Sequence, residues 1–438
     1  MASIRFSLLV LVIAYLLNAV LSFPPIKLQE DPAVTKFRTY LRFETVQPNP
    51  QAGYEQAIPW LREYAEELGL DFHYLDIPDP SDFALWMTWN GSDPSLKSVL
   101  LNSHMDVVAA EPEKWNHHPF EAFKDENGNI FARGAHDMKS PTIAQLEAIR
   151  RLKASGFQPL RNIHLSVMPD EENGGRKGMI PFLETNEFKN LNIGIDIDEG
   201  SSVGDETTMN IVYAEKAAWQ FNITARGAAA HASTLPEYTA AQRLQVVIDK
   251  IFAYRKSELQ RLETSNVTFD ELTSVNLARL GGGIGDNIIP NEVWAFFDMR
   301  IFLTQTWNFT DVENMLLNIT EAAQLGSSPN EVTLNFTAKP LYTGKTVVDD
   351  SNVWWTAVQE TCGELNLTCS PKVMSGVTDA RPVRHLNISA FGINPFPNQL
   401  STAHQDNEVM NEANFLKGIG RYAAFIQKFA SLPGNLHP

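Results

Sequence analysis

The stretch Val167-Met168-Pro169-Asp170-Glu171-Glu172-Asn173-Gly174-Gly175 follows the alternating apolar residues Ile163, Leu165 and Val167. This alternation predicts a buried strand that ends in three consecutive acids and two glycines. Ligand sites in open α/β sheets lie beyond the C-terminal ends of such strands. Adjacent carboxylates repel one another unless cations or protons lie among them. The stretch therefore indicates either a metal site or a solvated acidic turn.

Other apolar runs end in polar side chains in the same way. Residues 98–106 end in His104-Met105-Asp106, and residues 191–200 end in Asp196-Ile197-Asp198-Glu199-Gly200. Asp137 precedes a predicted helix, for which Ser140 supplies an N-cap and Pro141 a first-turn proline. The candidate ligands collected in this way are His104, Asp106, Asp137, Glu171, Glu172, Asp198, Glu199 and, far downstream, His404.

The chemistry of this set favours metal over a solvated surface. Two histidines and several carboxylates, without thiols, suit Zn²⁺, Mn²⁺ or Co²⁺ bound by nitrogen and oxygen. Buried strand ends rarely carry unpaired charge, so a purely structural role explains these residues poorly. The pattern predicts a site that holds two metal ions.

The chain changes character from about Ile211, where the acidic strand ends stop. The predicted order there is strand (212–226), helix (240–257), strands (274–280 and 292–302), helix (312–324) and strand (331–338). This is the order of a small split βαβ sandwich. The sequence therefore predicts an α/β catalytic domain in two parts, residues 23–209 and 339–438, with an inserted domain over residues 210–338.

The N-terminus and the composition restrict compartment and partners. Residues 1–22 contain Arg5, the apolar run Leu8–Leu21 and Ser22, the layout of a cleaved secretory signal, with a retained anchor as the alternative. No stable membrane span is expected, because the run is short. The excess of 52 acids over 35 bases argues against a nucleic-acid partner. Glycosylation acceptors agree with a secreted protein or one in the secretory lumen; they are Asn90, Asn222, Asn266, Asn308, Asn318, Asn335, Asn366 and Asn387.

The only two cysteines, Cys362 and Cys369, lie close together and far from the acids. In an oxidising compartment we expect them to form a disulfide, with a two-cysteine metal site as the weaker alternative.

Five motifs together resemble the M20 family of metallopeptidases and amidohydrolases, and within it the aminoacylase branch. They are Ser103-His104-Met105-Asp106-Val107-Val108, Arg133-Gly134-Ala135-His136-Asp137-Met138-Lys139, Pro169-Asp170-Glu171-Glu172-Asn173-Gly174-Gly175, Asp198-Glu199-Gly200 and the late His404. The resemblance implies a zinc-peptidase-like three-layer catalytic domain with an inserted ferredoxin-like lid and dimerisation domain. It also implies a homodimer that hydrolyses N-acyl-L-amino acids.

The same resemblance implies roles for individual residues. Asp137 bridges two zinc ions, with His104 and Glu199 on one ion and Glu172 and His404 on the other. Glu171 is left as the catalytic general base, and Asp106 is placed to orient His104. In the inserted domain His231 stabilises the oxyanion, often across a dimer, and a glycine-rich loop presents Asn287. Arg381 holds the free carboxylate of the substrate.

Departures from the family pattern and rival functions stay open at this point. Ala230 replaces a common glycine before His231, and His136 stands where glutamine is usual, as a tuning residue or a plain loop histidine. Trp354, Trp355 and Phe396 are either core residues or the wall of an acyl pocket. The rival functions are a dipeptidase or carboxypeptidase on the same scaffold, and a silent binding protein that kept the fold.

Overall fold

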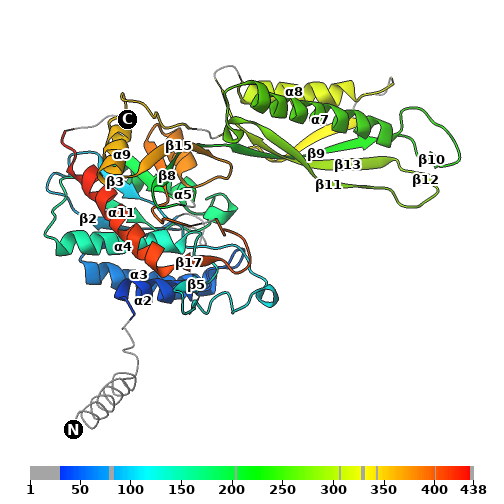
Figure 1. The fold of residues 1–438 in the computed structure, drawn as a ribbon. Helices are drawn as coiled ribbons and strands as arrows, with labels where there is room; N and C mark the ends of the chain where they lie inside the picture. The colour runs from blue at the N-terminus through cyan, green and yellow to red at the C-terminus, as the bar shows by residue number, and fades with distance from the viewer. Residues whose placement is uncertain are drawn as a thin grey trace, which may run out of the picture.

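The computed structural model describes residues 30–77, 83–202, 205–304, 307–326, 331–341, 344–399 and 401–434. The predicted signal over residues 1–22 lies outside the described residues. Within the described ranges no helix combines the length and the apolar character that crossing a lipid bilayer requires. Figure 1 shows a larger α/β part, from which a second domain projects to one side.

The larger part is built on one mixed sheet of eight strands in the order β1-β2-β6-β3-β7-β16-β8-β15. The central strand β3 runs parallel to both of its neighbours, β6 and β7. Their carboxyl ends therefore meet at one edge of the sheet. The strands are β1 (Asp71–Asp76), β2 (Phe83–Trp89), β3 (Ser98–Leu101), β6 (Ile163–Ser166), β7 (Ile193–Asp198), β8 (Thr208–Glu215), β15 (Thr368–Met374) and β16 (Ser389–Ile393).

Helices cover both faces of this sheet. Successive residues of β3 point to opposite sides: Val99 and Leu101 belong to one hydrophobic cluster and Leu100 to another. The first cluster is shared with α2 (Pro32–Leu41), α3 (Gln51–Leu68), α4 (Lys139–Ala154), α9 (Val353–Glu364) and α11 (Glu412–Ser431). The second is shared with α5 (Met179–Glu184), α6 (Asn186–Asn190) and α10 (Ala380–His385). The catalytic domain is therefore the three-layer α/β fold that was expected.

The projecting domain has one antiparallel sheet in the order β11-β13-β9-β14, with α7 and α8 on one face (Figure 1). This order of elements is ferredoxin-like, as the sequence predicts. Its elements are β9 (Ala217–Arg226), α7 (Ala240–Thr264), β11 (Ser274–Gly282), β13 (Glu292–Ile301), α8 (Phe309–Ala322) and β14 (Val332–Ala338). A small ribbon of β10 (Ala230–His231) and β12 (Ile288–Ile289) forms its far end.

The predicted strand over residues 212–226 is two strands that belong to different sheets. β8 pairs with β15 and β16 in the catalytic sheet, whereas β9 pairs with β13 and β14 in the inserted domain. The chain crosses between them at Lys216, so the inserted domain begins about seven residues later than the sequence suggested. The burial pattern of β9 agrees with its place in the inserted domain. Its residues are buried alternately, because helices cover only one face of its sheet.

Several local predictions are also decided by the structure. Cys362 and Cys369 form a disulfide, as expected. Trp354, Trp355 and Phe396 are buried in the main hydrophobic cluster, so they are core residues and line no acyl pocket. The predicted N-cap of α4 at Ser140 is wrong: the helix begins at Lys139, and Met138 occupies the cap position without a side-chain hydrogen bond.

Candidate metal centre

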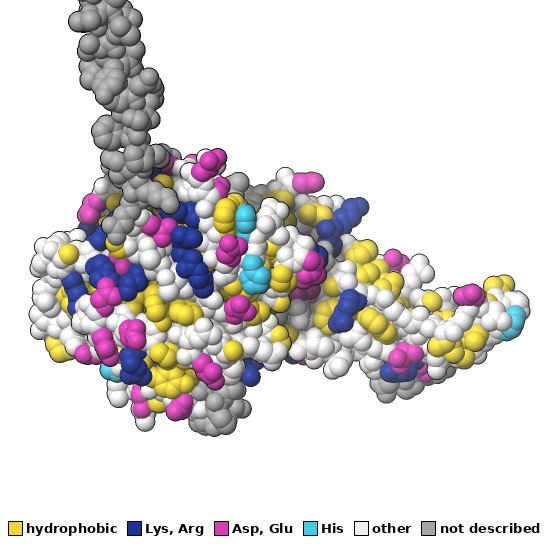
Figure 2. Space-filling view, turned by 90° about the horizontal axis from the view of Figure 1, so that it is seen from below, with side chains coloured by type: hydrophobic (Ala, Val, Ile, Leu, Met, Phe, Trp, Pro, Cys, Tyr) yellow, Lys and Arg dark blue, Asp and Glu magenta, His cyan; other side chains and the backbone are white. Residues whose placement is uncertain are grey.

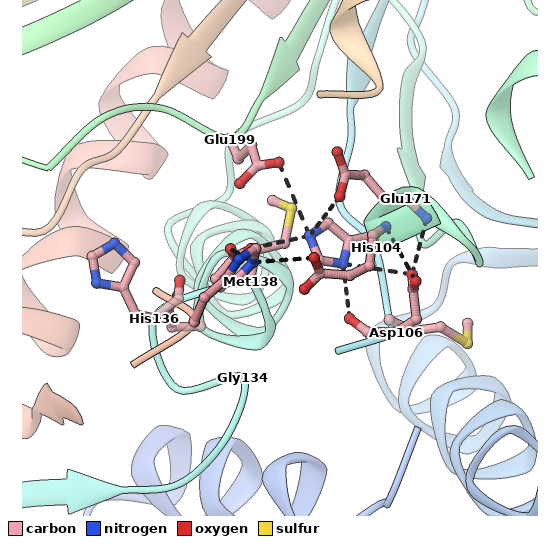
Figure 3. Close-up of polar contacts among 12 residues, drawn as sticks. His104, Asp106, Gly134, His136, Met138, Glu171 and Glu199 are labelled. Atoms are coloured by element: carbon pink, nitrogen blue, oxygen red, sulfur yellow. Dashed lines mark hydrogen bonds and ion pairs between the residues drawn. The ribbon is translucent and has the colours of Figure 1, made fainter. Parts of the chain in front are cut away.

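Three neighbouring strands deliver the predicted ligands to one place. His104 follows β3, Glu171 and Glu172 follow β6, and Glu199 follows β7. Asp137 comes from the turn before α4, and His404 from the loop before β17 (Val409–Asn411). Figure 3 shows Glu171 and Glu199 pointing toward the buried ring of His104 from either side. The parallel arrangement of β6, β3 and β7 is what brings these distant residues together.

One group of ligand atoms surrounds the Nε2 atom of His104. That atom lies 3.1 Å from Asp137 Oδ1, 3.8 Å from Glu171 Oε2 and 4.0 Å from Glu199 Oε1. The orientation of the His104 ring is fixed, because its Nδ1 atom lies 2.9 Å from the backbone carbonyl oxygen of Asp106. The backbone thus fixes which ring nitrogen faces the carboxylates.

A second group surrounds the Nε2 atom of His404. That atom lies 3.1 Å from Glu172 Oε2 and 3.3 Å from Asp137 Oδ2. Asp137 therefore offers one carboxylate oxygen to each histidine. This is the arrangement that a bridging ligand requires.

The turn that carries Glu171 and Glu172 is helical, not extended. Residues Glu171–Asn173 form one turn of 3₁₀ helix, preceded by Asp170 with φ of +66°. Gly175, with φ of +68°, closes the turn where an added Cβ would lie 2.6 Å from Asp379 Oδ1. Glu171 and Glu172 therefore do not diverge in the way that successive residues of an extended strand do. Instead a tight turn aims Glu171 at His104 and Glu172 at His404.

Two buried acids brace this turn. Asp170 accepts hydrogen bonds from the backbone N–H of Lys177 and the side-chain amide of Asn173. The carboxylate of Asp106 accepts from the backbone N–H groups of Glu171 and Glu172, at 3.1 and 3.3 Å, and from Gln47 at 2.9 Å. Asp106 Oδ1 lies 3.6 Å from His104 Nδ1. Its carboxylate therefore positions the catalytic turn more directly than it orients the imidazole.

Glu408 holds the loop of the bridging aspartate, a role that sequence reasoning missed. Its Oε1 accepts hydrogen bonds from the backbone N–H groups of His136, at 2.6 Å, and Asp137, at 3.0 Å. Its Oε2 accepts from Gly134 N–H and from the guanidinium of Arg133 at 2.7 Å. Glu408 is completely buried. The only signal in the sequence was its place four residues after His404.

Glu408→Gln should loosen this loop, because an amide NH₂ would face two of the four donors. We expect metal affinity and kcat/KM to fall by about ten- to a hundredfold. Zinc titration and steady-state kinetics on a synthetic amide substrate measure both. Asp406→Asn, which removes an exposed carboxylate from the same loop, is the matched control. Equal behaviour of the two variants would show that other contacts hold Asp137.

Two of the clustered carboxyl groups have raised pKa values. Burial raises the pKa of Glu171 well above its usual range, and the charge of nearby Glu199 raises it further. Burial and the neighbouring Asp137 raise the pKa of Glu199 in the same way. Hydrogen bonds to Asp137 and Glu172 raise the pKa of His404 to about 10. Cations compete with these protons for the same atoms.

The residues fit a pair of zinc ions. Ligand atoms of His104, Glu171 and Glu199 form one compact group, and those of His104, Asp137 and Glu172 form another. Glu172 Oε1 is buried without a hydrogen-bond partner among the described residues, as expected of an oxygen reserved for a cation. Imidazole and carboxylate without thiolate is the donor set of catalytic zinc.

Two cavities with different lining residues open on the ligands. A cleft of about 640 Å³ between the two domains contains Glu172 together with Arg381, the predicted carboxylate-binding residue. Arg381 itself is buried in α10. A smaller cavity of about 220 Å³ opens on Asp137 and Glu199 and contains His136. The ring of His136 points away from His104 in Figure 3, which places it in the cavity wall and not among the ligands.

His231 and Asn287 lie at the far end of the inserted domain, remote from the metal centre of the same chain (Figure 1). His231 is in β10, and its Nδ1 lies 2.7 Å from Ser233 Oγ. Asn287 is beside it, with its carbonyl oxygen accepting from Ala232 N–H at 2.9 Å. Both side chains are exposed. The structure of one chain therefore does not bring them to the ligands.

Comparison with known proteins agrees with this centre. The family model described as "Peptidase family M20/M25/M40" matches residues 100–428, which include every predicted ligand. The chain belongs to the M20 peptidase family. It is 40% identical to human aminoacylase-1 over 406 residues, covering 92% of this chain and 97% of that protein. Aminoacylase-1 of Dictyostelium discoideum is 36% identical over 422 residues, covering 92% and 99%.

Solved structures of lower identity share the M20 fold. The metallo-carboxypeptidase Sso-CP2 from Sulfolobus solfataricus has a TM-score of 0.68 at 20% identity, covering 91% of this chain and 99% of that one. Human carnosine dipeptidase 1 has a TM-score of 0.64 at 17% identity, covering 91% and 97%. Family membership and the ligand cluster together make this M20 chain a metal-dependent amide hydrolase.

Proposed function

We propose that this enzyme cleaves the amide bond of N-acyl-L-amino acids and releases a carboxylate and a free L-amino acid. The observation that carries the proposal is a cluster of imidazole and carboxylate ligand atoms in a chain that matches aminoacylase-1 over nearly its whole length. Glu171, buried beside His104, is the carboxylate that the family's division of ligands leaves for proton transfer. We propose two zinc ions per subunit as the cofactor.

The residues of the chain divide the reaction among them. Zinc bound by these ligands supplies a Lewis acid and lowers the pKa of water. Glu171 takes the proton of the attacking water and returns it to the amide nitrogen, which leaves as an amine. Arg381 in the cleft beside Glu172 pairs with the α-carboxylate of the substrate, where a guanidinium can form two parallel hydrogen bonds.

A substrate panel tests this function against its nearest rival, a dipeptidase or carboxypeptidase. The purified protein is loaded with zinc and given N-acetylmethionine, methionylmethionine and N-acetylmethionylmethionine. We expect N-acetylmethionine to be cleaved with the highest kcat/KM. Preference for the free dipeptide would indicate a dipeptidase, and preference for the blocked dipeptide a carboxypeptidase. A zinc-loaded protein that cleaves none of the three would revive the silent binding protein.

A homodimer formed through the inserted domain completes the proposal. β11 is the edge strand of the four-stranded sheet, and a cavity of about 500 Å³ lies between it and α7. Exposed Leu280 and the residues of this groove favour pairing with a second copy, because an open strand edge offers unpaired backbone groups. Figure 2 shows apolar side chains on the surface of this projecting domain. A partner subunit would supply the His231 and Asn287 that one chain keeps away from its own centre.

We also propose secretion and glycosylation, since the leader-like N-terminus and the eight acceptor triplets point the same way. Digestion of the natural protein with an endoglycosidase would detect the attached sugars as a loss of mass.

A further inference from the structure

The cavity beside Asp137 and Glu199 is separate from the cleft that contains Arg381. Its volume is about 220 Å³, and its wall includes the apolar side chains of Met138 and Met374 and the hydroxyls of Ser201 and Ser202. Among the described residues, the only charged side chains in its wall are Asp137 and Glu199. The cleft with Arg381 is lined by Glu172 and shares no lining residue with this cavity. A substrate that crosses the metal centre therefore extends into both.

The orientation of the substrate follows from the proposed function, on which this inference rests. If Arg381 holds the α-carboxylate, the amino-acid half of the substrate occupies the cleft beside Glu172. The scissile amide then lies at the ligands, and the acyl half extends toward Asp137 and Glu199. The cavity beside these two ligands is the space that remains for the acyl group.

The hydrogen bonds that Ser202 Oγ accepts determine whether its hydroxyl can donate to a molecule in this cavity. The Nδ1 atom of His136 accepts from the backbone N–H of Thr402 at 3.4 Å, so its Nε2 carries the hydrogen. That N–H donates to Ser202 Oγ at 2.8 Å, and the amide of Asn394 donates to the same oxygen at 3.3 Å. With its oxygen accepting twice, the Ser202 hydroxyl keeps its own hydrogen as a donor.

A second hydroxyl in the same wall is also unsatisfied. Ser201 Oγ is buried without a hydrogen-bond partner among the described residues. A buried hydroxyl that meets only hydrocarbon loses the hydrogen bond it made to water, so an alkyl chain in this cavity leaves two donors unpaired. An occupant that carries an oxygen acceptor satisfies at least one of them.

We infer that this cavity binds the acyl group of the substrate and selects short acyl groups that carry a hydrogen-bond acceptor beyond the scissile carbonyl. The volume holds about seven groups of water size, at about 30 Å³ each, which excludes long acyl chains. Met374, at the end of β15, contributes an apolar side chain to the wall of the cavity. The serine hydroxyls set its preference for oxygen over methylene.

An isosteric pair of substrates tests this selection. N-methoxyacetyl-methionine and N-butanoyl-methionine differ only by an ether oxygen in place of one methylene. We expect the wild type to prefer the methoxyacetyl substrate by about three- to tenfold in kcat/KM, the effect of one hydrogen bond. In Ser202→Ala this ratio should fall toward one. Ser257→Ala, which removes a surface hydroxyl from α7, should keep the wild-type ratio.

A second variant tests the size limit. Met374→Ala should raise kcat/KM for N-decanoyl-methionine, whose acyl group exceeds the size of the cavity, relative to N-acetyl-methionine by about tenfold, because one removed side chain enlarges the cavity. An unchanged ether preference in Ser202→Ala would overturn the proposal. So would a shift in amino-acid preference at constant acyl preference, since the cavity would then hold the amino-acid side chain. Failure of the wild type on every N-acyl substrate would refute the proposed function itself.

Discussion

Glu171→Gln should lower kcat by about a hundredfold to ten-thousandfold and leave zinc bound. The amide keeps the size and the turn of Glu171 but accepts no proton from the attacking water. Because the resemblance to the family assigns Glu171 to neither ion, although it lies among the ligand atoms, its replacement should not empty the centre. Zinc content by atomic absorption, together with steady-state kinetics on N-acetylmethionine, measures the two effects separately.

Glu172→Gln is the matched control, one residue away in the same 3₁₀ turn. Glu172 faces His404, so its replacement should remove metal as well as activity. Two variants with the same chemical change would then differ in zinc content. Loss of zinc from Glu171→Gln, or retention of full activity by it, would contradict the proposed assignment of the two acids.

Mixing two inactive variants should restore activity if the inserted domain works across a dimer. His231→Ala is expected to lose about a hundred- to a thousandfold in kcat, the effect of removing one oxyanion donor. The Glu171→Gln chain has an inactive centre of its own but keeps an intact His231. In a mixed dimer the His231→Ala chain has a complete centre and receives His231 from its partner. Random pairing of equal amounts should therefore recover about a quarter of the wild-type activity per chain.

In the control for this experiment, the Glu171→Gln chain is replaced by a double variant that carries both Glu171→Gln and His231→Ala. Mixed dimers of that kind contain no His231, so no activity should return. Refolding or subunit exchange before the assay, followed by light scattering, establishes that dimers have formed. A monomer, or a mixture that stays inactive, would exclude action of His231 across subunits.

Much of the centre could be predicted because strand ends leave a local signature. An apolar run that stops at a polar residue identifies His104, Glu171 and Glu199 without knowledge of the sheet. Parallel pairing of β6, β3 and β7 then places them together. The fold class followed from the same alternation of strands and helices, with an inserted antiparallel domain.

The contacts that hold the ligand loops in place could not be predicted, because one partner in each of them is a backbone N–H group. Glu408 acts on N–H groups of residues more than 270 positions away, and no side-chain pattern records such a contact. The N–H groups of Glu171 and Glu172 that Asp106 binds exist only in the tight turn. At Lys216, where the chain changes sheets, no glycine or proline separates β8 from β9. The pairing partners, and not a local turn signal, decide where each strand ends.

The position of His404 and Glu408 near the end of the chain has a consequence for biosynthesis. A ribosome that has released the first 400 residues has supplied every strand of the sheet, but neither the second imidazole nor the acid that holds the bridging loop. Domains fold in the order in which they emerge, so the inserted domain is complete while the hydrolytic centre is still open. The enzyme becomes active only when the segment with His404 and Glu408 docks, and a chain that terminates before this segment has no hydrolytic activity.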